Sequence, residues 1–169
     1  GGQTWEVISP DLSRNDPAHI VASGGPLTHD ITSIETYCTI VTLAESPLEA
    51  KVIWVGSDDG LVHLTRDKGK TWTNVTPELM PEWGRVASID PSATQTGRAV
   101  IAVNRYMLDD FRPYVFVTDD YGAHWRMISV GNGIPADHFV RVVREDPHRP
   151  GLLYAGTEFA LFLSVDQGR

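Results

Sequence analysis

Acidic side chains occur at glycine-bounded or polar turns that follow short runs of apolar residues. Asp58 and Asp59 lie in one such turn, and Glu158 lies in the corresponding turn of a later segment. Two carboxylates that face each other across a cleft can act as acid and base on a glycosidic bond, about 5 Å apart for retention of configuration and roughly 6.5 to 9.5 Å apart for inversion. Acidic hairpin tips are also common without any catalytic role. These three acids, together with Asp109 and Asp110, are therefore weak candidates for catalysis.

A second group of polar and aromatic residues lies in an insertion that spans residues 104–113. Aromatic rings stack on apolar faces of a ligand, carboxylates accept hydrogen bonds from hydroxyls, and the guanidinium fork binds carboxylates. Two residues of a neighbouring connection extend the group. The predicted ligand contacts are Arg105, Tyr106, Asp109, Asp110, Phe111, Arg112, Asp137 and His138. The alternative is an ordered loop that is held by its own Arg–Asp pairs.

A repeated phrase indicates the scaffold that positions these residues. The phrase at residues 65–72 returns at 118–125 and begins again at 164–169, and a broken copy opens the chain at residues 2–5. Asp67 and Asp120 are 53 residues apart, and the next Asp follows 46 residues later, at position 166. A unit of this length, with variable insertions, fits a four-stranded propeller blade better than shorter helical or leucine-rich repeats.

The composition of the repeated phrase indicates a self-contained turn between antiparallel strands. An Asp side chain can accept hydrogen bonds from backbone amides a few residues on, a Gly supplies a positive φ, and a Trp ring packs beside the turn. Because these residues occur once per repeat, a structural role is favoured over catalysis or metal binding, and no metal site or cofactor is predicted. The set comprises Thr65, Asp67, Gly69, Trp72, Thr118, Asp120, Gly122, Trp125, Ser164, Asp166 and Gly168.

The predicted fold class is therefore all-β: three consecutive four-stranded antiparallel blades of a larger β-propeller, forming a single partial domain over residues 1–169. The blade pieces are expected at 1–8, 38–76, 86–129 and 139–169, with a long loop over 10–37 that is either functional or disordered. Three blades do not close a ring. We therefore expect exposed apolar surface on both terminal blades, whose partners would be the remaining blades of the same full-length chain.

The topology of such blades places the candidate residues on one face. Connections from the second to the third strand, and from the fourth strand to the next blade, share one face of a propeller. The turns that contain the repeated Asp join the third strand to the fourth and fall on the opposite face. We therefore expect the acidic hairpins and the insertion to lie on a common functional face.

Charge and hydropathy exclude two classes of partner. The 14 basic and 22 acidic residues give a formal charge of −8, which argues against binding to nucleic acid. No apolar run approaches the length of about 18 residues that a membrane span requires.

The phrase Ser/Thr-x-Asp-x-Gly-x-Thr-Trp resembles the Asp-box, or bacterial neuraminidase repeat, of sialidases, xyloglucan-cleaving glycoside hydrolases and sortilin-type (VPS10) receptors. Residues 65–72 match it fully, His124 replaces Thr in the second copy, and the third copy stops before its Trp. The longer segments at 55–60 and 153–158 also resemble sortilin-like bacterial propellers. The resemblance implies a secreted or periplasmic protein.

The resemblance leaves two functions open. The favoured one is a sortilin-like binding scaffold for a protein, peptide or glycan. The alternative is part of an exo-acting glycoside hydrolase, so whether the protein is an enzyme stays open. A xyloglucanase-like site fits better than a sialidase, because Arg105 and Arg112 share one loop and Ile134-Pro135 follows Gly133 instead of the expected Arg.

Overall fold

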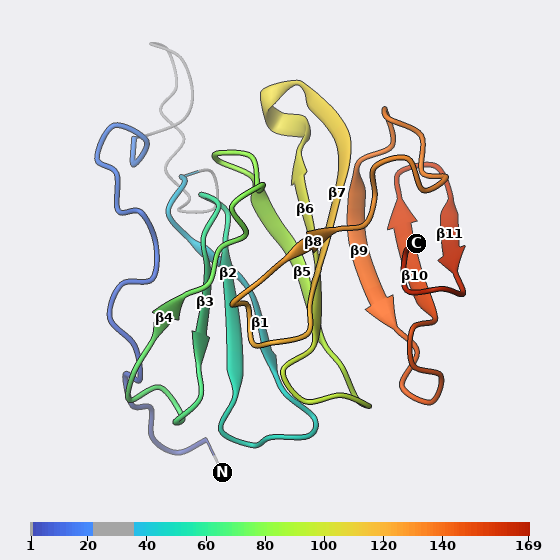
Figure 1. Ribbon diagram of the computed structural model, residues 1–169. Helices are drawn as coiled ribbons and strands as arrows, with labels where there is room; N and C mark the ends of the chain where they lie inside the picture. Colours follow the sequence, from blue (N-terminus) through green and yellow to red (C-terminus); the bar gives the residue numbers. More distant parts are fainter. Residues whose placement is uncertain (1, 22–35) are drawn as a thin grey trace.

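Three antiparallel β-sheets stand side by side in the computed structural model, which describes residues 2–21 and 36–169 (Figure 1). In the first two sheets the strands pair in chain order. The first sheet comprises β1 (Ile40–Glu45), β2 (Ile53–Ser57), β3 (Val62–Thr65) and β4 (Thr73–Asn74). The second sheet comprises β5 (Arg85–Pro91), β6 (Ala99–Arg105), β7 (Asp110–Thr118) and β8 (Arg126–Met127), with the 3₁₀ helix η1 (Tyr106–Leu108) between β6 and β7.

The third sheet has three strands: β9 (Val140–Glu145), β10 (Leu153–Thr157) and β11 (Leu161–Ser164). The all-β, antiparallel prediction is confirmed, but the expectation of four strands in this sheet is not met. In the other two sheets the fourth strand begins directly after the Trp of the repeated phrase, and no Trp follows Gly168.

Two boundaries differ from the sequence prediction. The first sheet begins at Ile40 and not at Cys38, because Cys38 adopts a positive φ of 71°, which is incompatible with a strand. The opening piece, predicted as a blade fragment, forms no strand within residues 2–8. It runs instead as an extended segment beside the first sheet, where the Trp72 indole Nε1 donates a hydrogen bond to the Ile8 carbonyl at 2.9 Å. Part of the predicted loop, residues 22–35, lies outside the described residues.

Alternating apolar side chains on the strands form two cores, one in each space between neighbouring sheets. The first core includes Trp54, Val62, Leu64, Ile101 and Phe116, which come from the first and second sheets. The second core joins the second and third sheets and includes Val100, Val115, Val117, Val143 and Leu153. Because β6 and β7 contribute to both cores, the second sheet is buried on both faces.

The repeated phrases form three turns of one design, which we call the aspartate turns: residues 65–72, 118–125 and 164–169. In the first, the Asp67 carboxylate accepts hydrogen bonds from the Thr65 hydroxyl at 2.8 Å and from the Thr71 backbone N–H at 2.9 Å. The Gly69 N–H donates to the Thr65 hydroxyl at 2.8 Å. The second turn repeats these contacts, with the His124 N–H donating to Asp120 at 2.9 Å.

The glycine of each aspartate turn also meets the preceding repeat. Gly122 has a φ of 81°, and a Cβ on it would lie 2.7 Å from the Val75 Cβ. The same close approach joins Gly69 to Ile8 and Gly168 to Ile128. The Trp125 indole donates to the Val75 carbonyl at 2.7 Å. Each aspartate turn is thus docked on the aliphatic residue that follows the Trp of the repeat before it.

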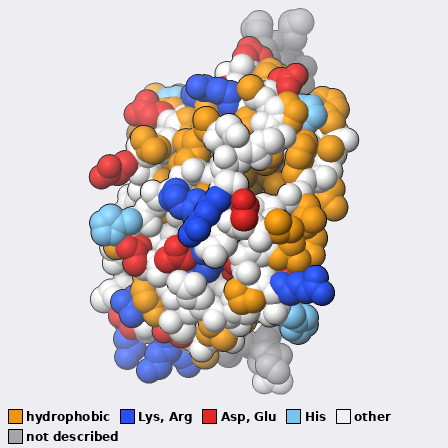
Figure 2. Space-filling view, turned by 45° about the vertical axis from the view of Figure 1, so that its right-hand side comes forward, with side chains coloured by type: hydrophobic (Ala, Val, Ile, Leu, Met, Phe, Trp, Pro, Cys, Tyr) orange, Lys and Arg blue, Asp and Glu red, His pale blue; other side chains and the backbone are white. Residues whose placement is uncertain are grey.

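The two outer sheets expose apolar side chains, as predicted. Ile40 and Leu43 on β1 are exposed, as are Leu161 and Leu163 on β11. Figure 2 turns the side of the molecule that carries the third sheet toward the viewer, and hydrophobic side chains gather on that face. The unpaired outer surfaces therefore contrast with the buried second sheet.

Candidate functional site

The connections β2–β3, β6–β7 and β10–β11 lie at one end of the sheets, and the aspartate turns lie at the other end. The β6–β7 connection projects at the top of the view in Figure 1. It holds the predicted insertion: β6 extends to Arg105, η1 follows, and Asp109 in the left-handed conformation (φ 55°) returns the chain into β7. We call this end of the molecule the loop face.

Asp110 is the internal anchor of the insertion. Its carboxylate accepts hydrogen bonds from the Arg112 guanidinium at 2.8 and 2.9 Å, the Arg105 guanidinium at 3.1 Å and the Tyr114 hydroxyl at 2.8 Å. The Arg112 hydrogen bonds hold the pKa of Asp110 well below its usual range, and burial together with Asp110 raises the pKa of Tyr114 to about 12. Asp110 is therefore ionised, and its carboxylate oxygens accept hydrogen bonds from side chains of its own hairpin. This arrangement favours a structural role for Asp110.

A groove of about 250 Å³ separates the insertion from the β2–β3 hairpin of the first sheet. It is bounded by apolar, aromatic and charged side chains from both sheets and from two loops. The described residues that line it are Thr36, Tyr37, Asp58, Trp83, Arg85, Asn104, Arg105, Met107 and Leu108. The structure thus brings two predicted site residues, Asp58 and Arg105, into one cavity, which we call the loop-face groove.

Asp58 and Asp59 are adjacent in sequence but have different environments. Asp59 is fully buried and accepts hydrogen bonds from the Arg14 backbone N–H at 2.7 Å and from the Ser57 hydroxyl. The Arg14 guanidinium in turn donates to the Asp59 carbonyl at 2.7 Å. Asp59 therefore fixes the N-terminal segment to the first sheet. Asp58 lines the groove, where burial raises its pKa and the Thr39 N–H donates to it at 2.8 Å.

Three aromatic side chains gather beside the groove. The Trp83 ring is stacked on His19, with centroids 3.9 Å apart, and the Tyr37 ring meets Trp83 edge-on at 5.6 Å. The Arg14 guanidinium lies over Trp83 at 5.1 Å from the ring centroid. Trp83, Tyr37 and Arg85 were not predicted as site residues from the sequence. One feature of the sequence could have indicated this cluster: Trp83 lies outside the repeated phrase, in the polar connection between the first and second blades.

The other side of the insertion contacts the third sheet. The Tyr106 ring is stacked on Phe139 at 4.7 Å, and Phe111 approaches the same ring at 6.1 Å. The Arg141 guanidinium lies 5.1 Å from the Tyr106 centroid and forms an ion pair with Glu158. The insertion therefore bridges the loop-face residues of all three sheets.

Two further predicted residues lie near this bridge. His138 lies 4.8 Å from the Phe159 ring, and Asp137 is exposed. The predicted acids are not gathered in one place: Asp58 is the single acid among the described residues that line the groove, while Asp59, Asp110 and Glu158 are engaged by other side chains. This arrangement does not supply the pair of facing carboxylates that hydrolysis of a glycosidic bond requires.

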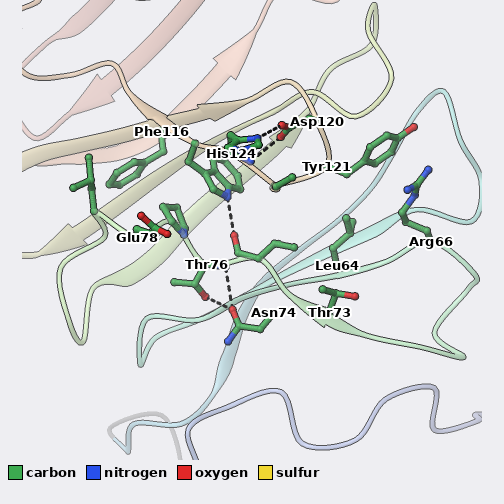
Figure 3. Close-up of a pocket in the computed structure, with 16 residues that line it drawn as sticks. Leu64, Arg66, Thr73, Asn74, Thr76, Glu78, Phe116, Asp120, Tyr121 and His124 are labelled. Carbon is green, nitrogen blue, oxygen red and sulfur yellow. Dashed lines mark hydrogen bonds and ion pairs between the residues drawn. The ribbon is translucent and has the colours of Figure 1, made fainter.

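A larger hollow of about 760 Å³ lies on the outer rim between the first and second sheets (Figure 3). The Asp120–His124 pair lies on one side of it and Asn74 with Thr76 on the other, and the Trp125 indole reaches across to the backbone. Trp125 and Asp120 belong to the repeat. We therefore assign this hollow to the packing of consecutive repeats and the loop-face groove to function.

Neither long apolar helices nor metal-binding clusters were found in the described part of the chain. Residues 2–21 and 36–169 contain no helix with the length and hydropathy to cross a membrane. Within the same residues, no three His, Cys, Asp or Glu side chains are grouped to hold a metal ion.

The architecture defines the class of protein: the chain is part of a β-propeller, since the solved structures that it resembles are β-propellers. One is YCF48 bound to D1 peptide (TM-score 0.59, 22% identity, 78% of this chain and 38% of that one). Another is an ancestral GH74 enzyme (TM-score 0.61, 20% identity, 78% of this chain and 18% of that one). A third is the GH74 xyloglucanase from Xanthomonas campestris (TM-score 0.55, 15% identity, 81% of this chain and 23% of that one).

These similarities define the fold, and the chain spans well under half of the length of each of these structures. No protein-family model matches the sequence, and no curated protein matches it.

Proposed function

We propose that this protein is a propeller-type binding scaffold whose loop-face groove takes an extended peptide segment of a partner protein. The observation that carries the proposal is the lining of the groove. Exposed apolar side chains of Met107 and Leu108 line it together with the guanidinium groups of Arg85 and Arg105 and with Asp58, the one acid among the described lining residues.

The stacking of the aromatic rings Trp83 and Tyr106 on neighbouring side chains favours a peptide ligand over a sugar. A sugar is recognised by stacking on an open aromatic face, but His19 covers a face of Trp83, and Phe139 covers a face of Tyr106. The exposed Met107 and Leu108 can receive an aliphatic or aromatic side chain of a peptide. The exposed Arg85 guanidinium can bind a carboxylate through its planar fork. The groove therefore suits a segment that places an apolar side chain next to an acidic group.

The comparisons supply support for this class of ligand. YCF48, whose fold resembles this one, has been solved with a bound peptide. We also propose that the protein is secreted or periplasmic, because its aspartate turns resemble the Asp-box of proteins with that location. Fractionation of the source cells tests that location.

A part in glycoside hydrolysis is the second candidate, and one residue favours it. Asp58 has a raised pKa because it is buried, which is the property of a general acid. The GH74 enzymes share the fold. Among the described residues, the groove lining includes no second acid.

Selection from a random peptide library, followed by anisotropy titration of the best labelled peptide, tests the binding proposal. Leu108→Ala and Arg85→Ala are each expected to weaken binding by about tenfold, or ~1.4 kcal/mol. The matched controls are Leu79→Ala and Arg126→Ala, which remove exposed side chains of the same type that do not line the groove. Failure to select any peptide, or equal effects of the control variants, would contradict the proposal.

Two further variants separate the alternatives. Release of reducing sugar from xyloglucan, abolished by Asp58→Asn, would replace the binding proposal with the hydrolase. Replacement of Asp109 and Arg112 by Ala tests the exposed side of the insertion, and an unchanged peptide affinity would confine the site to the groove.

A further inference from the structure

Asn104 is a buried polar residue in the lining of the loop-face groove. It lies on β6 and is 3% exposed. No hydrogen bond joins its side-chain amide to any described residue. Most buried polar groups of native proteins are hydrogen-bonded, because an unbonded one destabilises the fold. The exception at Asn104 points to a partner outside the chain.

Two other buried polar side chains in and beside the second sheet are bonded within the protein. The Ser88 hydroxyl accepts a hydrogen bond from the Val143 N–H at 3.1 Å, which joins the second sheet to the third. The Ser129 hydroxyl donates to the Pro113 carbonyl at 2.8 Å. The Asn104 amide makes no such contact in the described part of the chain, so the fold does not account for it.

The position of Asn104 is fixed by the strands around it. Asn104 is paired with Arg85 in the register of β5 and β6. The next residue, Arg105, is held by an ion pair with Asp110 at 3.1 Å. A group that is already held in place loses little conformational freedom when it binds a ligand. Asn104 is therefore better prepared for binding than a residue at a loop tip.

The amide of an Asn side chain carries both kinds of hydrogen-bonding group. Its oxygen accepts and its NH₂ group donates. A residue in an antiparallel strand likewise points its N–H and C=O toward one partner residue, and the two residues exchange both hydrogen bonds. The Asn amide can take the place of that partner. A carboxylate only accepts, so it would leave the Asn104 oxygen without a donor.

We infer that Asn104 binds the main chain of the peptide: its side-chain N–H donates to the carbonyl of one extended residue, and its oxygen accepts from the N–H of the same residue. The inference rests on the proposed function of the groove. Arg85 and Leu108 would contact side chains of the ligand, whereas Asn104 would contact its backbone. Main-chain hydrogen bonds supply affinity, and side-chain pockets supply specificity, when a protein binds an extended peptide. The contribution of Asn104 is therefore the same for ligands of different sequence.

Asn104→Leu separates a binding role from a structural one. Leu is close to Asn in size and removes the unbonded amide. The affinity for the selected peptide should fall about tenfold or more, because two hydrogen bonds are lost. The melting temperature should be kept or should rise by up to about 4 °C, because no buried amide is left without a partner. Asn74→Leu is the matched control: the Asn74 oxygen accepts a hydrogen bond from the Thr76 N–H at 3.0 Å, so this variant should lose stability and keep its affinity.

Methylation of the peptide backbone tests the same contact without altering the protein. Each backbone N–H of the selected peptide is replaced in turn by an N-methyl group, which removes one donor. At one position the affinity for the wild-type protein should fall about tenfold, and the affinity for Asn104→Leu should hardly change, because that variant already lacks the contact. Arg85→Ala, which removes a side-chain contact, should keep the full sensitivity at that position.

The results separate this inference from the proposed function. Failure to obtain any binding peptide would overturn both. Peptides that bind the wild-type protein and Asn104→Leu equally well, or N-methylation effects that are the same in the two proteins, would overturn the inference and leave the proposed function standing. A lower melting temperature in both Asn104→Leu and Asn104→Ala would assign the amide to the fold and would also overturn the inference.

Discussion

A buried ion pair joins the second and third sheets and provides the sharpest stability prediction. Arg98 precedes β6, and its Nε lies 2.9 Å from the carboxylate of Glu145 at the end of β9. The two side chains are 4% and 2% exposed. A second contact joins Arg98 to Asp119 at 2.6 Å, and the Gly151 N–H donates to Glu145 at 3.1 Å. The pair therefore has little access to solvent screening.

Removal of one partner leaves an uncompensated buried charge, which typically costs about 3–5 kcal/mol. Arg98→Met, which keeps the length of the side chain, should lower the free energy of unfolding by about this amount. With a urea dependence of roughly 2 kcal/mol per M, the unfolding midpoint should fall by about 2 M. The double variant Arg98→Met with Glu145→Met should recover most of the loss, because an apolar replacement of both partners is often neutral or stabilising.

Urea titrations followed by circular dichroism and by Trp fluorescence measure the effect. All five Trp residues, at positions 5, 54, 72, 83 and 125, lie outside the third sheet. In Arg98→Met the circular dichroism transition should therefore precede the fluorescence transition as the third sheet detaches. A loss below about 1 kcal/mol, or a double variant as unstable as the single one, would refute the reasoning that unpaired burial is the source of the cost.

Three other predictions concern the turns and the N-terminal segment. Gly122→Ala should destabilise the protein more than Gly131→Ala, as measured by thermal unfolding: both have positive φ, costing about 1–2 kcal/mol for Ala, but only at Gly122 would the new Cβ collide with the preceding repeat. Hydrogen bonds from Thr71 lower the pKa of Asp67 to about 2, so its stabilisation is complete above about pH 4 and is lost as the pH falls toward 2; acid titration of Asp67→Asn should show a smaller loss over that window. Asp59→Ala should accelerate proteolysis of the N-terminal segment, whereas equal cleavage rates would show that its hydrogen bonds do not anchor that segment.

The fold could be predicted because the repeated phrase combines three residue types with separate local functions. Asp67 and Gly69 define the turn by their own hydrogen bonds and backbone conformation, which involve few distant residues. The β-branched residues on either side of the turn favour strands, which the turn joins as an antiparallel pair. The opening blade piece was predicted from the same phrase, and its described residues, 2–8, form no strand.

The candidate site was predictable only in part, because it depends on which loops meet. Asp58 and Arg105 were named from their turns, and the structure places them in one groove. Trp83 and Tyr37 come from two other connections, and neither the length nor the polarity of a loop fixes where its tip lies. The different environments of Asp58 and Asp59 arise from the direction of adjacent side chains, which a sequence pattern in a tight turn does not specify.

The docking of each aspartate turn on the repeat before it has a consequence for the history of the gene. Val75 and Ile128 occupy equivalent places at consecutive joints, 53 residues apart. Removal or duplication of the stretch between them would leave each joint with the same type of contact, since each new neighbour would present an aliphatic side chain and a backbone carbonyl. Unequal recombination could therefore lengthen or shorten the array by whole units while the loop tips diverged independently.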